Sequence, residues 1–121
     1  MTIYKPAATW RALADQGKTW SKVLIYKVAG TPFDNSAYEA RMMVRRNYDS
    51  APVVSLTSDP SAGISLGGAN GQIVFFVSAV EMEDLLGKYV FDLELYDPTD
   101  DDVVLGIVRG TLEVRREVTH G

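Results

Sequence analysis

Four aspartates within six residues form the densest group of possible metal ligands in the chain. They are Asp97, Asp100, Asp101 and Asp102. Ca²⁺ binds six to eight oxygen atoms, and carboxylates supply many of them in proteins. However, an EF-hand loop alternates its acidic ligands and carries a glycine at its sharp turn, and the segment from Asp97 to Asp102 has neither feature. We therefore predict a solvated loop here, indifferent to Ca²⁺, with no metal ligands.

The remaining candidates for chemistry are also incomplete. His120 is the single histidine and lies next to the C-terminus, where a general base has few neighbours to orient it. The glycines of 67–71 lack the Lys-Ser/Thr pair of a phosphate-binding loop, which favours a β-turn. Asp92 and Glu94 share one face of a predicted strand, but they lack a facing pair across a cleft, as a glycosidase needs. We predict that the protein is not an enzyme and has no cofactor.

Aromatic and arginine side chains are the candidates for contacts with other molecules. Exposed aromatic rings on a β-sheet either stack on sugars or anchor protein interfaces, and packing in the core is the other reading. Alternation along a predicted strand places Arg41 and Arg45 on its outward face, where they either pair with the acidic loop of another copy or are solvated. The interface candidates are Trp10, Trp20, Tyr26, Arg41, Arg45 and Tyr48.

Composition narrows the class of protein. A chain of 121 residues suits one domain, which we place at 1–121, with residues 1–8 as a partly ordered N-terminal arm. The absence of cysteine excludes disulfides and thiolate metal sites. The net charge of −4 argues against general nucleic-acid binding, and the longest apolar run, 73–77, is too short to cross a bilayer. We expect neither nucleic acid nor membrane as a partner.

The predicted elements that would position these residues are almost all strands. Apolar and polar side chains alternate over 89–97, and extended structure resumes over 103–109 and 111–118, with Gly110 as a break between them. These three segments predict an antiparallel meander. Upstream, strands are predicted over 9–14, 18–28, 52–57 and 72–77, the last apolar on both faces and therefore central.

Two segments carry helical signals. The segment 37–46 combines strand alternation with good helix formers, and its neighbours favour a strand. Ser78 and Glu81 have the spacing of a capping box, so one or two helical turns are predicted before Gly87. Strand signals recurring about every ten residues, with turns between them, indicate an all-β fold, either a sandwich or a small barrel. We expect a two-layer antiparallel sandwich of seven to nine strands with one short helical turn.

Strand and turn signatures follow one another along the chain in a characteristic order. They are Trp10…Asp15-x-Gly17-x-Thr19, Gly30-x-Pro32-Phe33-Asp34, Tyr38-x-Ala40-Arg41-Met42-x-Val44-Arg45, Gly87-x-Tyr89-x-Phe91-Asp92-Leu93-Glu94-Leu95, Gly110-x-Leu112-x-Val114 and Val118-Thr119. This order resembles that of small bacteriophage and prophage structural proteins. The chain is similar to the immunoglobulin-like N-terminal domain of siphophage upper-baseplate proteins, although it lacks a long helical or receptor-binding segment after the domain.

The resemblance implies an immunoglobulin-like sandwich that forms homo-oligomers, with a trimer favoured, and that docks to other tail or baseplate proteins. It places the protein in a virion, made in the cytoplasm of a bacterial host. The alternative is a carbohydrate- or ligand-binding sandwich that uses Trp10, Trp20 and Tyr48.

Overall fold

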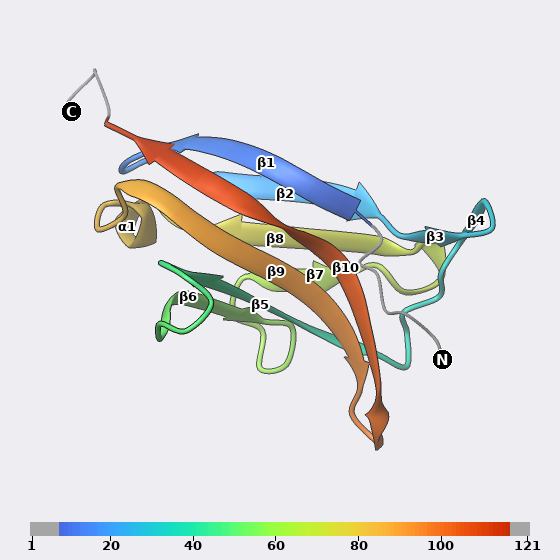
Figure 1. The fold of residues 1–121 in the computed structure, drawn as a ribbon. Helices are drawn as coiled ribbons and strands as arrows, with labels where there is room; N and C mark the ends of the chain where they lie inside the picture. The colour runs from blue at the N-terminus through green and yellow to red at the C-terminus, as the bar shows by residue number, and fades with distance from the viewer. Residues whose placement is uncertain (1–7, 117–121) are drawn as a thin grey trace.

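Two β-sheets pack face to face in the computed structural model, which describes residues 8–116 (Figure 1). The larger sheet has the strand order β1-β10-β9-β5-β6, the smaller one β2-β8-β7, and β3 and β4 form a separate two-stranded hairpin. A single turn of helix, α1, and a short 3₁₀ turn complete the part described. The strands are β1 (Ala8–Asp15), β2 (Trp20–Ile25), β3 (Lys27–Val28), β4 (Thr31–Pro32), β5 (Glu39–Arg45), β6 (Pro52–Thr57), β7 (Ile64–Leu66), β8 (Gln72–Val77), β9 (Gly87–Asp97) and β10 (Asp100–Arg115), with η1 at Gly68–Asn70 and α1 at Ala79–Met82.

Strand alternation places the core between the two sheets. Along β5 every second residue is buried, and the same period holds along the first part of β9. The ambiguous segment 37–46 is therefore a strand, as predicted. The core side chains are Trp20, Ala40, Met42, Val44, Val54, Leu56, Ile64, Ile73, Phe75, Val77, Met82, Leu85, Tyr89, Phe91, Leu93, Leu95, Ile107, Val108, Leu112 and Val114.

The strand order and the corner before β9 identify the sandwich as immunoglobulin-like. The variable-type arrangement joins strands C′, C, F and G in one sheet and B, E and D in the other, and β6-β5-β9-β10 and β2-β8-β7 reproduce it. The Tyr89 hydroxyl accepts a hydrogen bond from the Leu86 N–H at 3.0 Å, which is the tyrosine corner of this fold. Two residues later, where antibody domains carry a cysteine, Phe91 packs edge-on against Trp20 at 5.3 Å between ring centroids. An aromatic contact thus occupies the place of the inter-sheet disulfide.

The last third of the chain differs from the predicted meander. β10 runs unbroken for 16 residues, so the predicted break at Gly110 is wrong. A Cβ at Gly110 would lie 2.1 Å from the Trp10 carbonyl oxygen, so this glycine permits close approach of β1, which pairs with β10 in parallel. The other strand pairs are antiparallel, so the predicted two-layer antiparallel sandwich is confirmed, with the β1–β10 pair as its parallel exception.

The predicted acidic loop is shorter than expected. Only Pro98 and Thr99 form the turn between β9 and β10, and Asp97 pairs with Asp100 across it. The Asp97 carboxylate accepts hydrogen bonds from the N–H of Thr99 at 2.9 Å and from its hydroxyl at 2.7 Å. Beyond this self-contained turn the register shifts, because the pair after Asp97–Asp100 is Tyr96–Val104, and the hairpin tip projects beyond the rest of the sandwich (Figure 1).

The helical turn follows the prediction. The Ser78 hydroxyl accepts from the N–H of Glu81, and the Glu81 carboxylate accepts from the N–H of Ser78, which is the predicted capping box. The turn from Asp15 to Lys18 contacts the end of α1, because the Gly17 N–H donates to the Met82 carbonyl oxygen and the Gln16 side chain donates to that of the C-cap residue, Glu83. Of the predicted N-terminal arm, Ala8 already belongs to β1, and residues 1–7 lie outside the described part.

Candidate interaction surfaces

The outward face of the larger sheet carries a network of charged and aromatic side chains. Arg41 of β5 pairs with Glu94 of β9, which lies directly opposite it in the strand register. The Arg41 guanidinium also lies 4.5 Å from the centre of the Tyr96 ring, and the Tyr96 hydroxyl donates to Glu39 at 2.9 Å. That hydrogen bond is the main cause that raises the pKa of Tyr96. The predicted outward orientation of Arg41 is confirmed, and its charge is compensated within its own chain.

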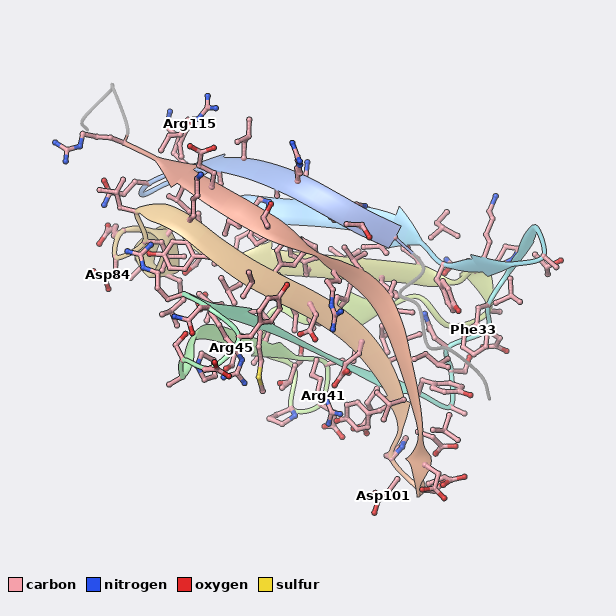
Figure 2. The ribbon with its side chains drawn as sticks, in the orientation of Figure 1. Phe33, Arg41, Arg45, Asp84, Asp101 and Arg115 are labelled. Atoms are coloured by element: carbon pink, nitrogen blue, oxygen red, sulfur yellow. The ribbon has the colours of Figure 1, made fainter. Side chains whose placement is uncertain are left out.

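The two arginines after Arg41 also have partners in the chain. Arg45 donates to the Ser50 carbonyl oxygen at 2.6 Å and contacts the Met43 sulfur at 3.1 Å. Arg46 donates to the carbonyl oxygens of Leu86 and Lys88 and lies over the Tyr89 ring at 4.4 Å, which ties β5 to the tyrosine corner. Figure 2 shows Arg41 and Arg45 along β5 and Asp101 at the distant hairpin tip. Within one chain, the arginines and the acidic tip do not meet.

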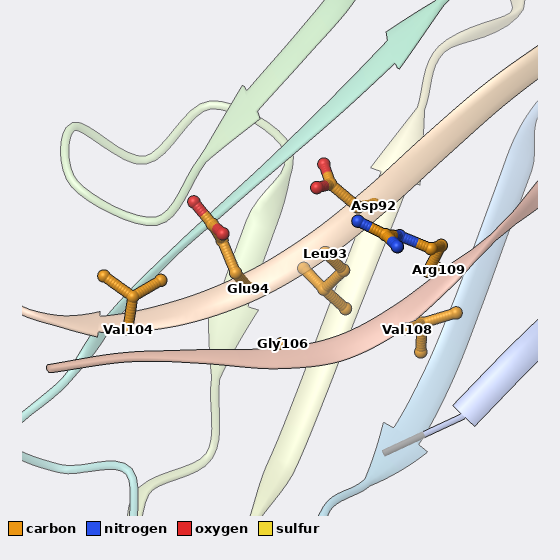
Figure 3. A pocket seen from close by; sticks show the side chains of 7 residues that line it. All are labelled: Asp92, Leu93, Glu94, Val104, Gly106, Val108 and Arg109. Carbon is orange, nitrogen blue, oxygen red and sulfur yellow. The ribbon is translucent and has the colours of Figure 1, made fainter. Parts of the chain in front are cut away.

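A shallow depression at the centre of the same face is lined by Asp92 and Arg109 (Figure 3). These two residues lie opposite each other on β9 and β10, but no ion pair within 4 Å joins them. Burial raises the pKa of the Asp92 carboxyl, Glu94 adds to the effect, and Arg109 acts against it. Among the described residues, no group of three or more His, Cys, Asp or Glu could hold a metal ion, here or elsewhere.

The six residues predicted as interface candidates are not gathered on one surface. Trp20 is 4% exposed and packs against Phe75 and Phe91, so its predicted interface role is wrong because the ring fills the core of its own chain. Trp10 faces inward from β1 and is half-buried. Tyr26 is half-buried and packs against Phe33, and Tyr48 is 70% exposed in the loop between β5 and β6. The aromatic platform expected of a sugar-binding module is therefore not assembled.

The smaller sheet carries a surface that the sequence analysis missed. Its outward positions contain four apolar side chains on two neighbouring strands, Val23 and Ile25 of β2 and Val74 and Phe76 of β8. Three of them are half exposed or more, Val23 at 64%, Ile25 at 53% and Phe76 at 50%. Val23 and Val74 are directly paired, so the four side chains form one group. We call this group the apolar face.

None of the described outward positions on the three strands of the smaller sheet, β2, β8 and β7, carries a charged residue. The other outward positions are Ser21, Ser65 and Gln72, which lie opposite or beside the apolar ones in the register. The larger sheet, in contrast, carries charged side chains on the outward face of β5, β9 and β10. The two outer surfaces of the sandwich are therefore chemically different.

Comparison with known proteins gives a limited result. No protein-family model matches the chain, and no curated protein matches it. One similar solved structure is of extracellular domains of the voltage-gated sodium channel beta4 subunit, described as parallel homodimers with a role in cell–cell adhesion. It shares 15% identity and a TM-score of 0.42, over 98% of this chain and 99% of that one. A second comes from a study of multimeric cell-adhesive interactions of sodium channel beta subunits, with 12% identity and a TM-score of 0.44, over 98% and 99%.

These findings correct two predictions. The solved structures are extracellular domains of a channel subunit and not phage baseplate proteins, and no family model connects the chain to a phage family. The resemblance to siphophage upper-baseplate proteins is therefore wrong, and the virion location that it implied is wrong with it.

Because both TM-scores are below 0.5, the immunoglobulin-like assignment rests on the chain's own strand order and tyrosine corner. No helix among residues 8–116 is long and apolar enough to span a membrane.

Proposed function

We propose that this domain is a non-enzymatic interaction module that works by self-association. The observation that carries the proposal is the apolar face, where Val23, Ile25 and Phe76 are half exposed or more on one side of a folded sandwich. Contiguous exposed apolar groups are uncommon on monomeric proteins and mark surfaces that contact other molecules. The larger sheet supports the same reading, since Arg41, Glu94, Tyr96 and Glu39 satisfy one another and leave little for a substrate to bind.

The test is the mass of the protein in solution as a function of its concentration. Sedimentation velocity from about 5 µM to about 500 µM should show a weight-average mass that rises above that of one chain, since weak apolar interfaces have dissociation constants in this range. A mass that stays at 13.3 kDa over the whole series would refute self-association.

A second candidate function is binding of a small polar ligand in the depression of the larger sheet. The observation that favours it is that Asp92 and Arg109 line this depression without an ion pair to each other. A ligand with both an acidic and a donor group would match one cation and one carboxylate. NMR titration with a panel of amino acids and acidic sugars tests it. Shifts confined to the amides around Asp92 and Arg109 support the site, and an unchanged spectrum excludes it for these ligands.

A further inference from the structure

We propose that two copies of this chain pack through their apolar faces, with the smaller sheets face to face about a two-fold axis near Val74. This inference rests on the self-association proposed above and adds to it the surface, the symmetry and the residue at its centre. Val74 has this place because β8 is the middle strand of the smaller sheet, and Val74 pairs with Val23 on one side and Ser65 on the other.

The charge distribution favours a second copy as the partner. A two-fold contact brings each surface against its own image, so a face that carries charges of one sign repels itself, and a neutral apolar face does not. The outward positions of the smaller sheet are Ser21, Val23, Ile25, Ser65, Gln72, Val74 and Phe76, and none is charged. The charged outer surface of each sandwich would lie on the far side of the pair, beyond the Debye length of about 8 Å at physiological salt. The net charge of −4 on each copy therefore opposes this arrangement less than any contact through the larger sheet.

The open edge of β2 would permit another mode of assembly, which Lys22 disfavours. β2 has β8 as its one partner in the sheet and is therefore an edge strand. Lys22 lies between Trp20 and Leu24 on the inward-facing side of β2, and it lines a surface depression with residues of β1. An inward-pointing lysine on an edge strand is a device that blocks edge-to-edge pairing. With the edge blocked, association occurs through the sheet faces. A two-fold contact uses the apolar face of both copies and therefore gives a dimer, in place of the trimer predicted from the sequence.

The size of the face predicts a weak dimer. β2 and β8 have six residues each and β7 has three. With strands spaced by about 4.8 Å and a rise of about 3.3 Å per residue, the planar footprint is roughly 240 Å² for each copy. The accessible surface buried on both copies is more than twice this footprint, because side chains protrude from the sheet. It still lies at or below the lower limit of standard interfaces, about 1,200 Å² in total. Such contacts are reversible, with dissociation constants in the micromolar to millimolar range. The dimer would form at high local concentration and dissociate on dilution.

The experiment uses charge pairs at the centre of the face, in the whole chain. Val74→Lys and Val74→Glu are each expected to weaken the dimer at least about tenfold in sedimentation velocity, because each places two like charges beside the two-fold axis. An equimolar mixture of the two variants should recover the dimer, since each Lys then meets a Glu. Circular dichroism confirms that the variants are folded. The matched controls are Val53→Lys and Val53→Glu, because Val53 is a 48% exposed valine on β6 of the other sheet.

The outcomes separate this inference from the proposed function. If wild type associates, the Val74 variants do not, and their mixture does, the apolar face is the interface. If the Val74 variants associate like wild type, or if the Val53 variants lose association instead, self-association stands and the proposed face is wrong. If wild type stays monomeric, both proposals fail. Raising NaCl from about 50 mM to about 500 mM should preserve or strengthen this dimer, whereas a dimer formed through the charged larger sheet would weaken.

Discussion

Replacing Trp20 by phenylalanine should change stability far less than its burial suggests. The indole is 4% exposed and contacts Phe75 at 4.9 Å and Phe91 at 5.3 Å between ring centroids. Its Nε1–H is buried and has no hydrogen-bond partner. A buried donor without a partner costs about 1–3 kcal/mol relative to the same group in water. The most closely packed aromatic group of the core therefore includes one unfavourable polar atom.

The expected magnitudes follow from what each substitution removes. Trp20→Phe loses part of a ring, worth about 1–2 kcal/mol of burial and packing, and regains about 1–3 kcal/mol by removing the unpaired N–H. The free energy of unfolding should then stay within about 1 kcal/mol of wild type. Trp20→Ala loses both aromatic contacts and leaves a cavity, at a net cost of about 3–5 kcal/mol. The free energy of unfolding of a domain of this size is about 6–18 kcal/mol. The alanine variant should therefore remain folded, with a free energy of unfolding only a few kcal/mol above zero if the wild type lies at the lower end of this range.

The assay is urea unfolding followed by circular dichroism, at a protein concentration of about 1 µM so that dimerisation does not contribute. Trp10→Phe is the matched control, since Trp10 is half-buried and its ring nitrogen is not a buried unpaired donor. If Trp20→Phe destabilises the protein as much as Trp20→Ala, the argument from the unpaired N–H is refuted. If neither substitution matters, Trp20 is not part of the core.

Three further predictions test other parts of the fold. Gly110→Ala should destabilise the protein by about 1–3 kcal/mol by forcing β1 away from β10, whereas Thr111→Ala next to it should have little effect, as thermal unfolding would show. The raised pKa of Asp92 means that the folded state binds more protons than the unfolded state between the two pKa values, so wild-type stability should fall as pH rises through that window. Asp92→Asn should remove this fall in urea titrations from pH 4 to pH 7, and a variant with the wild-type profile would contradict it. Replacing Pro98-Thr99 by Asn-Gly should change stability by less than about 1 kcal/mol and leave the melting temperature insensitive to millimolar Ca²⁺, and a Ca²⁺-dependent rise in either protein would reveal a metal site.

Strand patterns were enough to predict the fold class, because alternation reports directly which residues face a core. It assigned β5 correctly despite its helix formers, and Ser78 and Glu81 predicted the capping box of α1. The pattern was less informative where the backbone and not the side chain decides. Gly110 looked like a strand break because a glycine has no side chain to pack, whereas its role is to permit contact with the Trp10 carbonyl group of a strand about 100 positions earlier. No local signal identifies such a partner.

The candidate surfaces were harder to predict, because exposure depends on how many strands each sheet contains. Arg41 and Arg45 were placed outward correctly, but their partners Glu94 and Ser50 come from strand register and loop shape. For Trp20 the sequence leaves core and interface as alternatives, because a tryptophan near a turn has no sequence feature that separates the two. Its position is fixed by Phe75 and Phe91, which approach it from two other strands.

The sequence contains one signal for the apolar face. The segment 72–77 was predicted to be a central strand because it is apolar on both sides, and β8 is indeed the middle strand of its sheet. Yet Ile73, Phe75 and Val77 alone face the core, and Phe76 on the other side is 50% exposed. A strand that is apolar on both faces is normally covered on both. Since one chain covers β8 on one side, the pattern itself implies a second covering layer, and the two-fold packing of smaller sheets would provide it.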